Sequence, residues 1–220
     1  ATTGTVTLNT ATITANLTGA AADLADAFTG ITSHTGTLTV SDSAGTSVTA
    51  SDLVIIGGAT TGNVTVTNAL AISGSAAELE GALMTSGTLV TASTSNVTIT
   101  GAGAASVAQL KGINDATGAV TLNTATITAN LTGAAADLAD GFTGITSHTG
   151  TMTINGSVAA TVGDLKIIND ATTGAVTLNT ATITANLTGA AADLADGFTG
   201  ITTHTGTMTI NGSVAATVGD

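Results

Sequence analysis

The chain has no cysteine, proline, tryptophan or tyrosine, and its only basic residues are Lys111 and Lys166. Without cysteine it forms no disulfides, which fits a reducing compartment and equally fits exported proteins built without them. Fourteen acidic residues leave a net charge of −12. Nucleic acids and anionic membrane surfaces are bound by clusters of Lys and Arg. We therefore expect neither of these as a partner.

Long apolar stretches and large side chains are also scarce. The densest apolar run, Leu53–Ala59, is far shorter than the roughly 20 residues of a transmembrane helix, so we expect no membrane insertion. The only aromatic residues are Phe28, Phe142 and Phe198. A core must therefore be built from small and aliphatic side chains, arranged in many thin layers.

Three residue types dominate the composition. Thr (51), Ala (41) and Gly (28) supply most of the 220 residues, a bias typical of repetitive extracellular and structural proteins. Apolar residues still make up 43% of the chain, and β-branched residues recur in short runs. The chain therefore has enough apolar surface to fold.

The sequence is a tandem array of related segments, which we define before assigning any local structure. Residues 118–164 and 174–220 differ only at Ser147 and Thr203. The array stops inside a repeated phrase at Ser213–Asp220, which predicts a processed product or a window of a longer array. We divide the chain into repeats 1–58, 59–115 (divergent), 116–170 and 171–220 (incomplete).

Each repeat of about 55 residues contains two strand-like phrases. In "AVTLN" and "TMTIN" apolar residues alternate with Thr, which places Val176 and Leu178, or Met208 and Ile210, on one face of a strand. The segment Ala181–Ala185, "ATITA", alternates in the same way and is expected to be a second short strand or an extension of the first.

Helix-like segments follow the strands. In "TGAAADLADGF" Leu194 and Phe198 are four residues apart, and in "SVAQLKGIND" Val107, Leu110 and Ile113 form one apolar stripe. The "ND" pairs Asn114 with Asp115 and Asn169 with Asp170 are interpreted as turns that leave these helices.

These patterns predict an α/β repeat solenoid in which short parallel strands alternate with short Ala-rich helices, about two coils per repeat. The four repeats would then form one continuous solenoid. Parallel strands lie about 4.8 Å apart, whereas packed helices need about 8 to 10 Å, so the helices must crowd or the array must curve. Small residues such as Ala134–Ala136 and Ala139 favour crowding. The alternative is a string of separate α+β beads, one per repeat.

No motif indicates catalysis. The chain has no nucleophile elbow, phosphate loop or cysteine, and its dispersed glycines precede strands, as turns require. We therefore predict that it is not an enzyme and has no catalytic or cofactor-binding residues. His34, His148 and His204 occupy one equivalent position and are interpreted as loop histidines, because equivalent positions two coils apart are too distant to share a metal ion.

Acidic pairs recur at three-residue spacing, which places both carboxylates on one helix face. Their expected role is a solvated surface, with weak calcium binding between coils or molecules as the alternative. Asn-x-Thr sequons also recur and predict possible glycosylation. The acidic pairs are Asp23 with Asp26, Asp137 with Asp140, and Asp193 with Asp196. The sequons begin at Asn16, Asn63, Asn96, Asn130 and Asn186.

Rows of threonine raise a different possibility. Stacked "T-x-T" coils would present a ladder of hydroxyl and methyl groups, an arrangement that resembles ice-binding solenoids. The simpler interpretation is that Thr forms the exposed face of each strand.

The phrases "LTGAAADLADGFTGIT", "TGNVTVT" and "SVAQLKGINDATGAVTL" resemble the tandem repeats of giant Thr-, Ala- and Gly-rich bacterial cell-surface proteins, particularly those of cyanobacteria. The resemblance covers the whole chain and implies an extracellular or cell-surface protein that forms layers, adhesins or filaments. Our first hypothesis is a structural protein whose partners are copies of itself or further repeats of the same chain. The second is an ice- or polysaccharide-binding solenoid that uses its Thr ladder.

Overall fold

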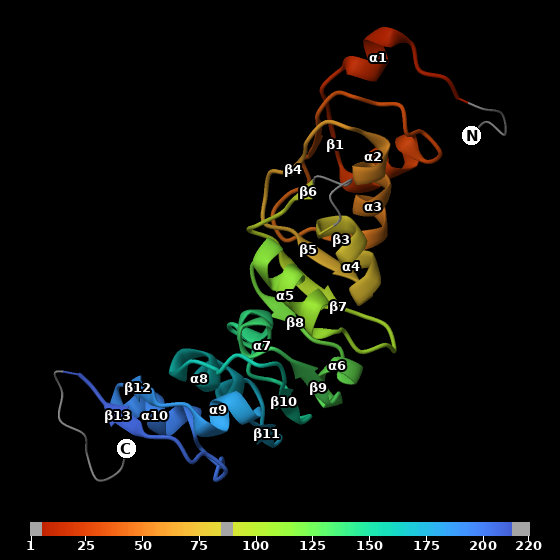
Figure 1. Cartoon of the computed structure of the whole chain (residues 1–220). Coiled ribbons are helices and arrows are strands. Elements are labelled where there is room, and N and C mark those ends of the chain that lie inside the picture. The colour runs from red at the N-terminus through yellow and green to blue at the C-terminus, as the bar shows by residue number, and fades with distance from the viewer. Residues whose placement is uncertain (1–5, 85–89, 213–220) are drawn as a thin grey trace. The chain divides into compact units, whose positions relative to one another are not determined.

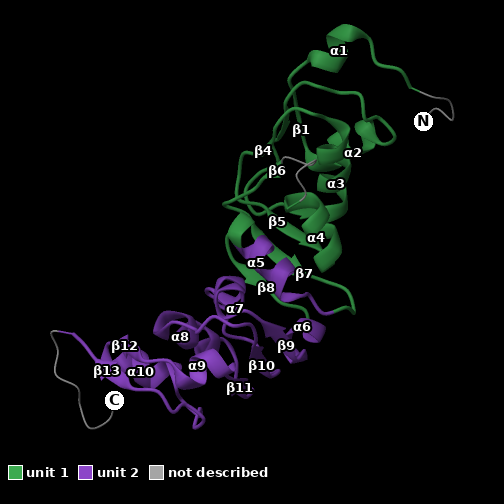
Figure 2. Cartoon of the chain, viewed as in Figure 1, with its two compact units in different colours: residues 1–103, 115–123 green, residues 104–114, 124–220 purple. Residues whose placement is uncertain are grey.

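A computed structural model of the chain describes residues 6–84 and 90–212. The predicted break in the array at Ser213–Asp220 lies outside these residues. Two compact units make up the chain (Figure 2). Unit 1 contains residues 1–103 and 115–123, and unit 2 contains residues 104–114 and 124–220.

In unit 1 two four-stranded parallel sheets lie beside a row of helices (Figure 1). Their strand orders are β1-β2-β4-β6 and β3-β5-β7-β8. The elements are α1 (Thr10–Thr14), β1 (Leu17–Gly19), α2 (Ala21–Phe28), β2 (Leu38–Val40), β3 (Ser47–Thr49), α3 (Ala50–Ala59), β4 (Val64–Val66), β5 (Ala71–Gly74), α4 (Ala76–Leu83), β6 (Val90–Thr91), β7 (Asn96–Ile99) and β8 (Val120–Thr121).

Unit 2 repeats the scheme with a three-stranded parallel sheet, β9-β10-β11, and a parallel pair, β12-β13. The elements are α5 (Val107–Ala116), most of which belongs to this unit, α6 (Thr124–Thr128), β9 (Leu131–Gly133), α7 (Ala135–Phe142), β10 (Met152–Ile154), α8 (Val162–Ala171), β11 (Val176–Thr177), α9 (Thr180–Thr184), β12 (Leu187–Gly189), α10 (Ala191–Gly197) and β13 (Met208–Ile210).

Every strand pair in the described residues is parallel. Each connection between paired strands therefore brings the chain back to the same end of the sheet. Leu38, for example, pairs with Leu17 on one side and with Val64 on the other. We call the segment between two such partners a turn of the chain. Because helices occupy the return path, the expected alternation of short parallel strands with short helices is confirmed.

Strand pairing crosses all three boundaries between the sequence repeats. Leu38 pairs with Val64 across the first boundary, Val97 with Val120 across the second, and Met152 with Val176 across the third. The strands are nevertheless divided among separate small sheets. The closer spacing of strands than of helices is a physical reason for such interruptions.

Apolar strand residues and one face of the longer helices supply the core, whereas α1 buries no residue. Leu38, Val64 and Met152 are fully buried, as the alternation in the sequence predicts. Helix α3 packs against α2 and α4, and α8 packs against α7 and α10. The predicted helical stripe at Val107, Leu110 and Ile113 is buried.

The expected strand at Ala181–Ala185 is wrong, because the segment forms helix α9. The Asn179 side chain caps the helix by accepting from the Thr182 amide at 2.9 Å, and the Thr184 hydroxyl donates to the Thr180 carbonyl. These local bonds offset the weak helix propensity of Thr. The Thr182 hydroxyl is buried and accepts from the Ala160 amide of the preceding turn.

The predicted turns at the two "ND" pairs are also wrong. Asn114 and Asp115 lie inside α5, and Asn169 and Asp170 lie inside α8. Asn usually weakens a helix by bonding to its own backbone. Here the Asn side chains bond instead to the neighbouring helix, as described below.

Candidate functional site: the contacts between successive turns

A glycine corner precedes many of the strands and brings the backbones of successive turns into contact. A Cβ placed on Gly150 would lie 1.9 Å from the Ala129 carbonyl oxygen, and one on Gly174 would lie 2.2 Å from the Gly150 oxygen. Unit 1 has the same arrangement, with Gly62 against the Gly36 oxygen at 2.4 Å. Any side chain at these positions collides with backbone, so the corners hold the turns in register.

A buried polar cluster lies behind two of these corners, at Gly174 and at Gly62. In unit 2 the Thr172 hydroxyl donates to the Gly150 carbonyl at 2.7 Å and accepts from the Gly174 amide at 2.9 Å. His148 is fully buried beside Thr172 and packs edge-on against Phe142, with ring centroids 5.1 Å apart. In unit 1 the equivalent His34 lies 3.2 Å from the Thr60 hydroxyl.

All three histidines lie outside the helices and strands, in agreement with their interpretation as loop residues, but two of the three are buried. His34 and His148 are fully buried, and His204 is partly buried with Nε2 3.1 Å from the Ala185 carbonyl. Desolvation lowers the pKa of His148, although the nearby backbone of Thr126 and Ala129 offsets part of this effect. Each ring sits beside its own Phe. They act as packing residues of separate turns.

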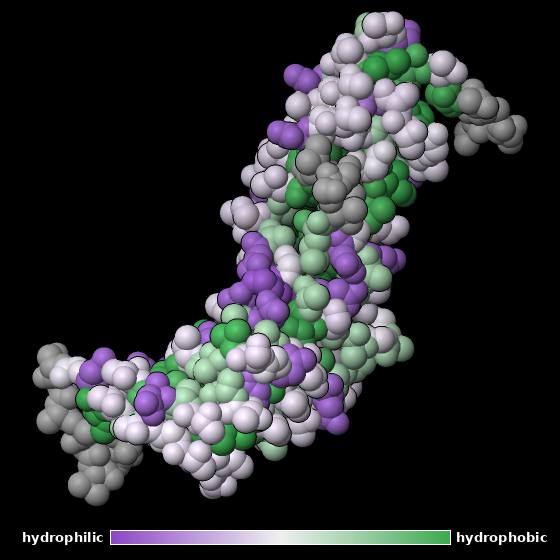
Figure 3. Space-filling model, in the orientation of Figure 1, coloured by the Kyte–Doolittle hydropathy of each residue, from purple (hydrophilic) through white to green (hydrophobic). Residues whose placement is uncertain are grey.

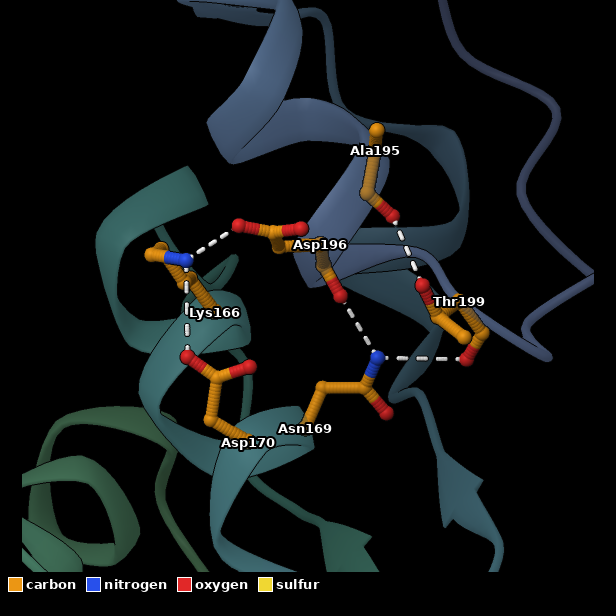
Figure 4. A network of polar contacts seen from close by, with 6 residues as sticks. All are labelled: Lys166, Asn169, Asp170, Ala195, Asp196 and Thr199. Carbon is orange, nitrogen blue, oxygen red and sulfur yellow. Dashed lines mark hydrogen bonds and ion pairs between the residues drawn. The ribbon is translucent and has the colours of Figure 1, made fainter. Parts of the chain in front are cut away.

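Helices α8 and α10 are joined by a polar clamp (Figure 4). Lys166 bonds to the Asp196 carboxylate and also lies 3.4 Å from Asp170. The amide of Asn169 donates to the backbone carbonyls of Asp196, at 2.6 Å, and of Thr199, at 3.2 Å. One helix therefore donates hydrogen bonds to carbonyl groups at the end of the next helix; the Asp196 carbonyl also accepts a longer bond, of 3.4 Å, from the Thr199 amide.

The same clamp joins α5 to α7. Lys111 bonds to Asp140, and Asn114 donates to the carbonyls of Asp140 and Thr143 at 2.8 and 3.1 Å. The chain's two lysines thus occupy equivalent positions and make equivalent contacts. A repeated contact of this kind lets one interface serve along an array.

Glycine allows the clamped helices to approach closely. A Cβ on Gly197 would lie 3.2 Å from the Lys166 amide nitrogen, and one on Gly141 would lie 3.2 Å from that of Lys111. The ion pairs themselves contribute little to stability, because both partners are exposed to solvent. The hydrogen bond to Asp196 raises the pKa of Lys166, so its charge is retained at neutral pH.

The acidic pairs occupy three environments. Asp140 and Asp196 belong to the clamps. Asp23, Asp137 and Asp193 lie in the first turns of α2, α7 and α10, and Asp26 lies later in α2, outside the two clamps. Within residues 6–84 and 90–212, no three His, Asp or Glu side chains are placed to hold a metal ion together. Calcium binding by these pairs stays a prediction.

Threonine occupies one face of the strands in register. Thr18, Thr39, Thr65 and Thr91 are successive partners across β1, β2, β4 and β6, and Thr132, Thr153 and Thr177 are partners across β9, β10 and β11. All are exposed or half-buried. The surface view in Figure 3 is mostly pale, as expected where Thr and Gly, with hydropathies near zero, predominate.

Several sequon asparagines have structural roles. The Oδ1 atoms of Asn16, Asn130 and Asn186 accept from the amides of Thr37, Thr151 and Thr207 in the following turn, each at 3.1 Å. Asn96 bonds in the same way to Ala119. These side chains link turns; their glycosylation stays a prediction.

The clamp was missed by the sequence reasoning, although one signal pointed to it. Both lysines precede an Asn by three residues, a spacing that places the two side chains on one helix face. Among the described residues no helix is long and apolar enough to cross a membrane. Comparisons of the chain with protein-family models, with characterised proteins and with solved structures find no match.

Proposed function

We propose that the protein is a structural repeat protein whose turns stack into a solenoid that forms part of an extracellular fibre, surface layer or adhesin stalk. The observation that carries this proposal is the strand pairing across every repeat boundary. The recurrence of the Lys-Asn clamp supports it, because one interface then serves repeatedly.

The remaining features agree with a structural role. The residues singled out by sequence and geometry bond to the neighbouring turn of the same chain, as Asn169 and Thr172 do. The composition and repeat style resemble those of giant bacterial cell-surface proteins, which supports an extracellular or cell-surface location.

A repeat-extension series tests whether the turns form one coupled array. A second copy of residues 118–173 is inserted after Thr173, and urea unfolding of the extended and original chains is compared. In a coupled array each added repeat seals its neighbours, so both the unfolding midpoint and the denaturant dependence of the free energy rise. Unchanged values for both would show independent beads and defeat the proposal.

The Thr rows favour a second candidate, binding of ice or a polysaccharide. Their hydroxyls lie on strands in exact register, as at Thr39 and Thr65, and neighbouring strands of a sheet are about 4.8 Å apart. Freezing hysteresis and glycan-array binding test this function directly. Replacing Thr65 with Val keeps the strand propensity and removes one hydroxyl, so reduced binding with an unchanged unfolding midpoint would support the second candidate.

A further inference from the structure

Asparagine side chains hold successive turns together at many places, and one asparagine stands apart from them. The Oδ1 atoms of Asn130 and Asn186 accept from backbone amides of the following turn. The Nδ2 atom of Asn123 donates to carbonyl groups of the preceding turn. The Asn155 side chain, in contrast, is exposed and makes no hydrogen bond among the described residues. Its amide group is therefore accessible to reaction.

The residue after Asn155 is Gly156, which favours one reaction of the asparagine side chain. The Gly156 backbone nitrogen attacks Cγ of Asn155 and closes a succinimide ring, and the proton that this nitrogen gives up leaves with the side-chain amide group as ammonia. Water then opens the ring at either carbonyl carbon, which gives Asp or an isoaspartate whose main chain runs through Cβ and Cγ. Glycine has no Cβ to hinder the attack. Gly156 is also exposed, and its amide donates no hydrogen bond among the described residues.

Asn179, in the following turn of the chain, restrains the residues that must move. Its Nδ2 atom donates to the carbonyls of Asn155 and Gly156, at 3.3 and 3.0 Å, and to that of Val158 at 2.8 Å. The attack requires rotation about the bond between Cα and the carbonyl carbon of Asn155. Because this rotation turns the Asn155 carbonyl away, the hydrogen bonds from Asn179 must loosen first. The rate of the reaction therefore depends on how firmly one turn is held by the next.

We propose that Asn155 and Gly156 form a self-modifying site at which isoaspartate accumulates spontaneously, with Asn179 as the restraint that slows the reaction. Water is the co-reactant and ammonia the by-product. The isoaspartate form adds a methylene group to the main chain and a carboxylate to the turn that Asn179 holds. Modification therefore loosens the contact between two successive turns. This inference goes beyond the proposed function and does not depend on it, because the reaction needs only the folded chain.

Timed incubation of the folded chain at mildly alkaline pH, followed by tryptic digestion and mass spectrometry, tests the site. Cleavage after Lys111 and Lys166 separates Asn155 from Asn211, whose surrounding sequences are identical. Fragmentation should find Asp and isoaspartate at Asn155 at a rate at least about tenfold that at Asn123, because Asn123 is followed by a β-branched threonine and not by glycine. Reaction of Asn155 no faster than that of Asn123 would overturn the proposal.

Two variants separate the site from its restraint. Asn155→Gln keeps an exposed amide but requires a larger and less favourable ring, so modification at this position should fall to the level seen at Asn123. Asn179→Asp keeps the cap acceptor of α9 and removes the donor to the turn. The rate at Asn155 should then rise about fivefold, the factor that corresponds to the loss of one net hydrogen bond. An unchanged rate would overturn the role of Asn179 as the restraint.

The modified protein tests the loosening of the contact between turns. The fraction that contains isoaspartate at Asn155 should unfold at a lower urea midpoint than the fresh chain. Asn155→Asp adds the charge without lengthening the main chain, so its midpoint should stay close to that of the original. Equal midpoints for the isoaspartate fraction and the fresh chain would overturn the loosening. The repeat-extension series does not involve this reaction, so a failure of the proposed function and a failure of the modification site are told apart.

Discussion

At the scale of single residues, glycine is required here for two different reasons. Gly144 has φ +77°, which favours glycine, and its missing Cβ would meet nothing within 4 Å. Gly150 lies outside the left-handed region, and it is required because a Cβ would collide with the Ala129 carbonyl oxygen at 1.9 Å. The first is a requirement of the local backbone conformation, and the second is a contact between two successive turns of the chain.

We predict that Gly150→Ala lowers the free energy of unfolding by about 3 kcal/mol or more, because neither backbone can move without breaking the strand register. Gly163→Ala in helix α8 is the matched control. Its added Cβ would meet only the Thr161 hydroxyl oxygen, at 3.7 Å, and Ala favours the helix more than Gly does. Its free energy of unfolding should therefore rise slightly. Urea unfolding of both variants provides the measurement. Equal effects would show that the corner contact does not govern stability.

The buried histidine predicts a loss of stability in acid. Burial lowers the pKa of His148 below its ordinary value of 6.5, so the unfolded chain binds a proton more readily than the folded chain. The stability contributed by the neutral ring is therefore fully present above that value and is lost as the pH falls through it.

Unfolding free energies measured from about pH 8 to about pH 5 should fall more steeply for the original chain than for His148→Gln, which cannot titrate in this range. Each protein is referred to its own value at the higher pH, so the cost of the substitution itself cancels. Parallel pH profiles for the two proteins would show that His148 titrates alike in both states.

At the scale of the elements, the clamp between α8 and α10 contains an ion pair and a set of hydrogen bonds whose contributions to stability can be measured separately. Asn169→Ala removes two bonds to carbonyl groups of the neighbouring helix end and should cost about 1 to 2 kcal/mol. Lys166→Met removes a solvent-screened ion pair and keeps the apolar stem, so it should destabilise the chain less than Asn169→Ala does. Thermal unfolding of the two variants ranks them, and the opposite ranking would make the ion pair the main link between α8 and α10.

The short Asn-capped helices permit a matched pair of substitutions. Asn179→Asp keeps the cap acceptor for α9 but removes the donor to the carbonyls of Asn155 and Gly156, so it should destabilise the chain by about 1 to 3 kcal/mol. Asn9→Asp keeps the cap of α1 in the first described turn, where no earlier turn lies among the described residues. Its expected effect on the free energy of unfolding is near zero. Equal effects on the urea midpoint would show that only the cap matters.

The elements were predictable from the sequence where side-chain periodicity alone decides them. The buried stripe of α5 and the alternation of Met152 with Thr153 in β10 are read directly from spacing. Helix α9 was not predictable in this way, because its "TATIT" sequence alternates like a strand and its helical form depends on the Asn179 cap and on contacts with the preceding turn. Asn169 likewise stays within α8 because its partners lie on α10. Long-range bonds of this kind leave no local pattern in a sequence.

At the scale of the whole molecule, the boundaries of the compact units differ from those of the sequence repeats. The second boundary between repeats, at residue 115, falls where the chain passes from unit 2 back to unit 1, and β8 of the third repeat joins the sheet of unit 1. Repeats defined by sequence therefore exchange strands with their neighbours. A module that shares its strands in this way has no complete sheet when it is cut out alone.

Net charge governs how copies of the whole molecule meet. With −12 on each copy, two chains repel one another at low ionic strength. Screening shortens the range of this repulsion to about 8 Å at physiological ionic strength and to about 3 Å at 1 M. Association measured by sedimentation should therefore strengthen as NaCl is raised, and should approach a plateau once the repulsion is screened.

The same measurement separates screening from calcium binding. CaCl2 and MgCl2 at equal ionic strength should promote association equally if the divalent ions act only by screening the acidic surface. A larger effect of CaCl2 would indicate specific binding, and Asp137→Asn, which removes one member of an acidic pair outside the clamp to Lys111, should then abolish the difference. Weaker association at high NaCl would contradict the dominance of repulsion and would point to ion pairs between copies, formed by the two lysines of one chain with acids of another.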